Sequence, residues 1–90
     1  MEIKEILVRN YYATKRRGQI TDKMKTLDFV LKIEEEFNEL LSSTDNNSND
    51  FDIKELADIV LVCFAMAKHN DKDLLKVMEE KMLFNEKRPD

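Results

Sequence analysis

The chain has 90 residues, with one glycine, one proline and a net charge of −4 from 19 acidic and 15 basic residues. This length predicts a single domain, 1–90. Hairpin turns usually need glycine or proline, and because the chain has only one of each, we expect an all-α fold. The negative net charge disfavours binding to a nucleic acid polymer, although it allows a small phosphate-bearing ligand that is held through a metal ion.

The amino-terminal segment, MEIKEILVRN, lacks the uninterrupted apolar region of a secretory signal peptide. The apolar run at residues 59–67 is far shorter than the roughly 20 residues that a membrane span needs. We therefore expect a soluble, cytoplasmic protein with no membrane partner. The single cysteine, Cys63, cannot form an intrachain disulfide, and its apolar neighbours predict that it packs as a small hydrophobe.

Apolar residues at helical spacing predict two helices in the first half of the chain. The first covers about residues 2–17 and ends at Gly18, which follows a basic run. Thr21 can cap the second helix, whose apolar face continues to about Ser43.

The second half predicts two more helices after a polar loop, SSTDNNSND at 42–50. The third covers about 52–68, and the fourth begins after Asn70, with Asp73 placed to cap it. Four helices with short links predict a four-helix bundle. The third helix has no polar face over residues 59–67, and three companion helices can barely cover it. We therefore expect a second subunit to pack on it, in a homodimer or homotetramer.

Two pairs of carboxylates stand three residues apart on the second and third helices, Glu36 with Glu39 and Glu55 with Asp58. This spacing places each pair on neighbouring turns of one helix face. If the two helices are antiparallel, the four carboxylates converge. Like charges at such short range require a cation, and hard oxygen donors suit Mg²⁺ or Mn²⁺.

Each pair also has a purely structural interpretation. The acidic run 34–39 is typical of a solvated helix face, and Asp52 with Glu55 resembles a capping box at the start of the third helix. The purely structural interpretation is weaker for Asp58, because this residue directly precedes the apolar run, where an unpaired carboxylate is costly.

Three motifs together resemble the MazG-like all-α nucleotide pyrophosphohydrolases: E-E-F-N-E at 35–39, E-L-A-D at 55–58, and K-M-L-F-N-E-K-R-P at 81–89. The family signature is E-E-x-x-E on one helix followed by E-x-x-D on the next. The match extends from about the second helix to the end of the chain. The resemblance implies a MazG-like bundle that is completed by homo-oligomerisation.

The resemblance also implies a reaction: Mg²⁺-dependent hydrolysis of a ribo- or deoxyribonucleoside triphosphate to the monophosphate and pyrophosphate, with Mn²⁺ as a possible replacement. The implied metal ligands are Glu36, Glu39, Glu55 and Asp58. Glu35, grouped with Glu36 as catalytic, is a further ligand or orients the attacking water. Lys81 and Asn85 match the lysine and asparagine that contact phosphate or sugar, and Arg88 is a looser candidate.

Several residues depart from the family pattern or allow two interpretations. Asn38 stands where the motif often has glycine, and Glu34 falls inside an arc that is commonly apolar. Base-recognising residues in the family come from the first helix, where Tyr11 and Tyr12 are candidates either for stacking on a base or for the core. His69 is predicted to cap the end of the third helix rather than to act in catalysis.

A second class of function competes with hydrolysis, namely a non-catalytic helical oligomerisation or regulatory protein derived from the same fold. Five methionines offer an adaptable surface for such a role, although methionine at helical spacing also fills cores. A third class is a metal-binding module without chemistry. The full set of four carboxylates favours the enzyme over the non-catalytic protein, whereas the metal-binding module predicts tight cation affinity without turnover.

Overall fold

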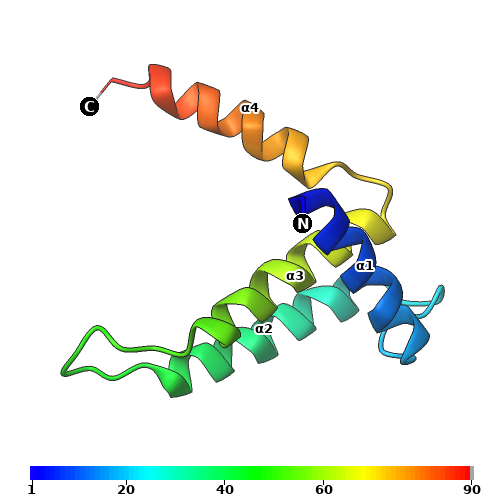
Figure 1. The fold of residues 1–90 in the computed structure, drawn as a ribbon, viewed down its shortest axis with the longest axis horizontal. Helices are drawn as coiled ribbons and strands as arrows, with labels where there is room; N and C mark the ends of the chain where they lie inside the picture. The colour runs from blue at the N-terminus through cyan, green and yellow to red at the C-terminus, as the bar shows by residue number, and fades with distance from the viewer. Residues whose placement is uncertain (90) are drawn as a thin grey trace.

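The computed structural model describes residues 1–89, which form four α-helices and no strand (Figure 1). They are α1 (Ile3–Arg16), α2 (Thr26–Ser43), α3 (Ile53–His69) and α4 (Leu74–Lys87). The prediction of an all-α chain with four helices is confirmed. α2 and α3 lie side by side as an antiparallel hairpin, α1 packs on α3, and α4 extends away from the end of α3 (Figure 1).

Side-chain caps begin two of these helices where the sequence predicts them. The Asp52 carboxylate accepts a hydrogen bond from the Lys54 backbone N–H at 2.9 Å, and that of Asp73 accepts from the Lys76 N–H at 3.1 Å. Both bonds satisfy amide groups that have no partner within the first turn of a helix. At the end of α1, Gly18 adopts a φ of 78°, a conformation that glycine tolerates better than other residues.

The start of α2 differs from the prediction that Thr21 caps it. The helix begins at Thr26, and the Asp28 carboxylate accepts a hydrogen bond from the backbone N–H of Lys25 at 2.8 Å. The Thr21 carbonyl instead closes a turn by accepting from the Met24 N–H at 3.1 Å. Met24 packs partly buried against the core, and this contact holds the preceding residues outside the helix.

The core is small and lies where α1 crosses the end of the α2–α3 hairpin. Its buried apolar members are Tyr11, Ile20, Phe29 and Ala65, of which Phe29 is completely inaccessible to solvent. Because residues from α1, α2, α3 and the first connection all contribute, this cluster fixes the position of α1 on the hairpin.

His69 is half-buried against this core, with its ring centroid 4.9 Å from that of Phe29, and its ring bonds groups outside α3, so the prediction that it caps α3 is wrong. Its Nε2 lies 3.2 Å from the Met24 carbonyl oxygen, and its Nδ1 lies 3.1 Å from the Tyr11 hydroxyl oxygen. Because a carbonyl oxygen only accepts, we assign the proton of the neutral ring to Nε2, and Nδ1 accepts from the tyrosine. Asn70 occupies the C-cap instead. The lone histidine therefore joins α1, α3 and the segment before α2.

Much apolar surface remains outside this core. The accessible surface is 7410 Å², whereas a folded monomer of 10.7 kDa is expected to expose about 5,500 Å². The radius of gyration is 15.2 Å, against about 12 Å for a compact chain of this length. No residue of α4 is buried. Among the described residues, no helix combines the length and apolarity that crossing a membrane requires.

Candidate functional site

Three glutamates converge between α2 and α3. Glu36 and Glu39 extend from α2 and Glu55 from the first turn of α3, and one carboxylate oxygen of each lies within 4.8 Å of the others. The three-residue spacing on α2 and the antiparallel packing of α3 together produce this arrangement. We call these residues the carboxylate cluster. The structure thus brings together three of the four residues that the sequence predicts as metal ligands.

Two oxygens of this cluster are buried without a partner. Glu36 Oε2 and Glu55 Oε2 are inaccessible to solvent, and neither has a hydrogen-bond partner within residues 1–89. Loss of hydration raises the pKa of Glu36 to about 7, with the negative charges of Glu39 and Asp58 as further causes. Loss of hydration also raises the pKa of Glu55, assisted by the neighbouring Glu39. A proton or a cation would relieve the repulsion in this cluster.

The capping-box interpretation of Glu55 is not what the structure shows. The backbone N–H of Asp52, which a capping-box glutamate would accept from, donates instead to Ser43 Oγ at 3.2 Å. Ser43 in turn donates to the Leu40 carbonyl at 2.8 Å. This bridge ties the end of α2 to the start of α3 and leaves the Glu55 carboxylate free to join the cluster.

Asp58, the fourth predicted ligand, lies beside the cluster rather than in it. Its side chain is exposed, although its charge contributes to the raised pKa of Glu36. Because this side chain stays in solvent, the cost that the sequence predicts for an unpaired carboxylate before the apolar run does not arise in the single chain. The physical reason is that α1 covers α3 around Ala65, which leaves the first turns of α3 open (Figure 1).

A cavity of about 280 Å³ extends from Glu36 and Asp58 toward α1. Apolar side chains such as Leu61 and Val62 line part of it, and its polar lining includes Glu35 and several residues that sequence reasoning missed: Asn10, Thr14, Arg17, Gln19 and Lys32. Lys32 precedes Glu36 by one helical turn, and its positive charge opposes the rise in the Glu36 pKa. That spacing was the one signal in the sequence that pointed to a cation at this position.

The two tyrosines of α1 do not line this cavity. Tyr11 is a core residue, whereas Tyr12 is 53% exposed, and their rings meet edge to face with centroids 5.4 Å apart. The Lys68 ammonium lies 5.5 Å from the centroid of each ring. The side chains of α1 that do border the cavity are Asn10 and Thr14.

The predicted substrate-binding residues Lys81, Asn85 and Arg88 are separated from the carboxylate cluster. The first two belong to α4, which diverges from the α2–α3 hairpin, and Arg88 directly follows that helix (Figure 1). The Arg88 guanidinium carbon lies 5.9 Å from the ring centroid of Phe84. Within the single chain, these three residues do not join the candidate site.

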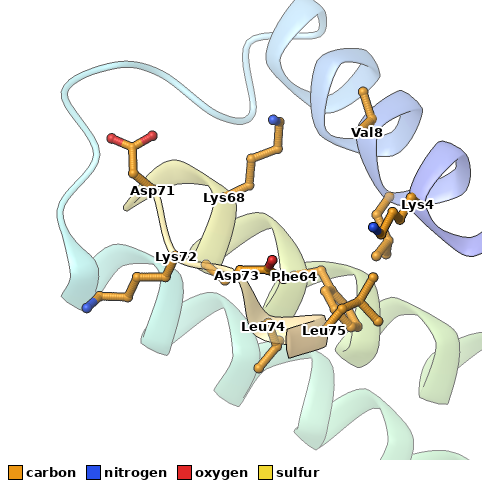
Figure 2. Close-up of a pocket in the computed structure, with 11 residues that line it drawn as sticks. Lys4, Val8, Phe64, Lys68, Asp71, Lys72, Asp73, Leu74 and Leu75 are labelled. Atoms are coloured by element: carbon orange, nitrogen blue, oxygen red, sulfur yellow. The ribbon is translucent and has the colours of Figure 1, made fainter. Parts of the chain in front are cut away.

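A second cavity, of about 480 Å³, lies between the first half of α1, the end of α3 and the start of α4 (Figure 2). α1 contributes Lys4 and Val8 to it, α3 contributes Phe64 and Lys68, and Leu74 and Leu75 of α4 add to its apolar lining. It contains none of the residues that the sequence predicts for the site. We therefore place the candidate site at the carboxylate cluster.

No protein-family model, curated protein or solved structure matches this chain.

Proposed function

We propose that this chain is a MazG-like, Mg²⁺-dependent nucleotide pyrophosphohydrolase, which converts a ribo- or deoxyribonucleoside triphosphate into the monophosphate and pyrophosphate. The observation that carries the proposal is the carboxylate cluster, in which two buried oxygens lack partners. Its three members occupy the positions expected from E-E-x-x-E and E-x-x-D motifs on successive helices. An acidic surface that was merely solvated would keep these oxygens in water.

The cluster fits a magnesium ion by its donor chemistry. Carboxylate oxygens are the hard donors that Mg²⁺ prefers, and Mn²⁺ accepts the same set. Glu36, Glu39 and Glu55 would hold the ion, with Asp58 completing the set from the next turn of α3. When bound, the ion supplies neutralisation of phosphate charge and a water of lowered pKa. Glu35, which lines both the cavity beside Glu36 and the hollow beside Glu39, would orient that water.

The cavity beside the cluster suits part of a nucleotide. Its volume of about 280 Å³ lies near the lower end of the roughly 300–1,000 Å³ that small-molecule sites occupy, so it would hold the base and sugar rather than the whole nucleotide. The apolar part of the lining would contact the base, and the Asn10 and Gln19 amides offer donors and acceptors to its edge. Arg17 and Lys32 would face the phosphates.

The large exposed surface supports a homodimer or homotetramer as the functional state, in which other copies complete the bundle. The surface exceeds the monomer expectation by about 1,900 Å², which is enough for a stable protein–protein interface. We place this oligomer in the cytoplasm, with a nucleotide substrate and without a nucleic acid polymer or a membrane as partner.

The test is a panel of canonical and modified NTPs and dNTPs incubated with the purified protein. Each is assayed with Mg²⁺, with Mn²⁺ and with EDTA, and monophosphate plus pyrophosphate are read separately from diphosphate plus phosphate. We expect metal-dependent monophosphate and pyrophosphate, lost in Glu36→Gln and retained in Glu79→Gln, which alters a glutamate on α4.

A folded, oligomeric protein that turns over none of these nucleotides would reject the enzyme. The exposed apolar surface would then favour the non-catalytic oligomerisation protein. Binding of Mg²⁺ without turnover would instead indicate a metal-binding module.

A further inference from the structure

The start of α3 carries only half of a capping box. In a complete box, the N-cap side chain accepts from an amide of the first turn, and the acidic side chain at the third helical position accepts from the N-cap amide. Asp52, the N-cap, does accept from the Lys54 N–H at 2.9 Å. Glu55 occupies the third helical position, but the Asp52 N–H donates to Ser43 Oγ at 3.2 Å instead. The second half of the box is therefore replaced by a contact from α2.

The start of α2 shows what an acidic side chain does at the same position when the N-cap amide is left to it. There, the Asp28 carboxylate accepts from the backbone N–H of Lys25, the N-cap, at 2.8 Å. A hydrogen bond to a carboxylate is charge-assisted and stronger than one to a neutral hydroxyl. Glutamate is also the usual residue at this position of a capping box. The Glu55 carboxylate therefore gives up a favourable bond, and Ser43 is the group that takes its donor.

The hydroxyl of Ser43 is fully committed by its surroundings. Ser43 is the last residue of α2, one turn after Glu39, and lines with Glu39 and Glu55 the hollow beside Glu39. It donates its one proton to the Leu40 carbonyl at 2.8 Å, so its oxygen is free to accept from the Asp52 N–H. The same proton cannot satisfy the Glu55 carboxylate, whose buried Oε2 has no partner within residues 1–89.

We infer that Ser43 is a positioning residue that selects between two places for the Glu55 carboxylate. While Ser43 Oγ holds the Asp52 N–H, the Glu55 carboxylate stays in the carboxylate cluster. Without that hydroxyl, the Glu55 carboxylate turns to the Asp52 N–H and completes the capping box. On the proposed function, on which this last step rests, Ser43 maintains one ligand of the magnesium ion without contacting the ion or the nucleotide.

Crystal structures of the parent and of Ser43→Ala, both in EDTA, test the selection directly. In the variant we expect a Glu55 carboxylate oxygen at about 3 Å from the Asp52 backbone nitrogen and away from the carboxylate cluster. Thr44→Ala is the matched control, because the exposed Thr44 hydroxyl donates to the same Leu40 carbonyl at 2.9 Å. That control should leave Glu55 in the cluster.

Stability and metal affinity separate this role from a merely structural one. In EDTA, Ser43→Ala should melt no lower than the parent, because Glu55 gains a donor and leaves the neighbouring carboxylates. Mn²⁺, added to the nucleotide-free protein and followed by electron paramagnetic resonance, should bind at least about 10-fold more weakly. Thr44→Ala should bind Mn²⁺ as the parent does. Ser43→Thr keeps a hydroxyl at this position and should match the parent in both measurements.

Two results would overturn the inference. One is a Ser43→Ala structure in which Glu55 remains in the cluster. The other is a lower melting temperature of Ser43→Ala with unchanged Mn²⁺ affinity, as the loss of a purely structural bridge would give. A parent that binds no Mn²⁺ and hydrolyses no nucleotide would reject the proposed function, while the place of Glu55 in the Ser43→Ala structure would still decide whether Ser43 controls it.

Discussion

Glu36 of α2 and Glu55 of α3 each bury one carboxylate oxygen, Oε2, that has no hydrogen-bond partner in the described part of the chain. One oxygen from each of these residues and from Glu39 lies within 4.8 Å of the others. A carboxylate loses hydration in such a position without gaining a donor in return. The pair therefore destabilises the fold when both groups are charged, and a bound cation would reverse that effect.

The first prediction concerns the dependence of stability on pH and metal. The pKa of Glu36 is about 7 in the folded state, above its usual value of 4.5, so the folded protein keeps a proton that the unfolded chain releases between these values. In EDTA, the free energy of unfolding should therefore fall as the pH rises from about 4.5 to 7. Mg²⁺ should raise the melting temperature at pH ~8 and have little effect at pH ~4.5, as calorimetry can measure.

The matching variant is Glu36→Gln, which removes the charge and keeps the shape. In EDTA at pH ~8, the free energy of unfolding of this variant should exceed that of the parent by about 1 kcal/mol. This gain is smaller than the full pKa shift of Glu36 implies, because solvent still reaches the site and screens the charges. Mg²⁺ should stabilise this variant much less than the parent. Glu79→Gln on α4 serves as the control, and an equal gain in stability there would contradict the assignment of the effect to the cluster.

The second prediction is that Asp58→Asn abolishes hydrolysis and preserves the fold. We expect kcat/KM to fall on the order of 10²-fold or more, because the variant loses a charge that completes the metal site. The side chain is exposed, so the free energy of unfolding should stay within about 0.5 kcal/mol of the parent or rise slightly. Steady-state kinetics and urea denaturation measure the two effects. Unchanged activity would remove Asp58 from the site.

The third prediction concerns the hydrogen bond between Tyr11 and His69. Tyr11→Phe removes the hydroxyl at 3.1 Å from Nδ1 and leaves that nitrogen without its donor. The cost should be about 1–2 kcal/mol in the free energy of unfolding, measured in urea. Tyr12→Phe is the matched control, because Tyr12 is exposed and should change stability by no more than about 0.5 kcal/mol. Equal stability of the two variants would show that the hydrogen bond contributes nothing.

The fourth prediction tests the size of the core. Phe29 is its one completely buried large side chain, so Phe29→Ala should cost about 3–5 kcal/mol. That is a large share of the stability of a chain this short, and we expect a strongly lowered urea midpoint or loss of helical circular dichroism. Leu27→Ala, two residues earlier and 63% exposed, should leave the midpoint nearly unchanged. Similar losses in both variants would contradict a core centred on Phe29.

Local chemistry explains which parts of the fold could be predicted. Apolar spacing and polar caps such as Asp52 and Asp73 depend on neighbours within one or two turns, so the four helices and most of their ends follow from the sequence. The start of α2 was predicted wrongly because Met24, held against the core by distant residues, overrides the local cap at Thr21.

The candidate site also combines features that could be predicted from the sequence with features that could not. The three-residue spacing of Glu36 and Glu39 and the short loop before α3 were enough to predict that carboxylates of α2 and α3 meet. The exposure of Asp58 and the packing of His69 against the core could not be predicted, because both depend on where α1 crosses the hairpin. The cavity lining from Asn10 to Lys32 depends on that same crossing.

By itself, the sequence determined the helices and the pairing of acidic positions on two successive helices. It also determined the lack of a segment long and apolar enough to span a membrane. Each of these features depends only on local spacing and composition. Only the tertiary structure decided that Glu36 and Glu55 bury unpartnered oxygens and that α4 extends away from the hairpin. Burial and interhelical contact depend on which surfaces meet, and residues far apart in the chain settle that together.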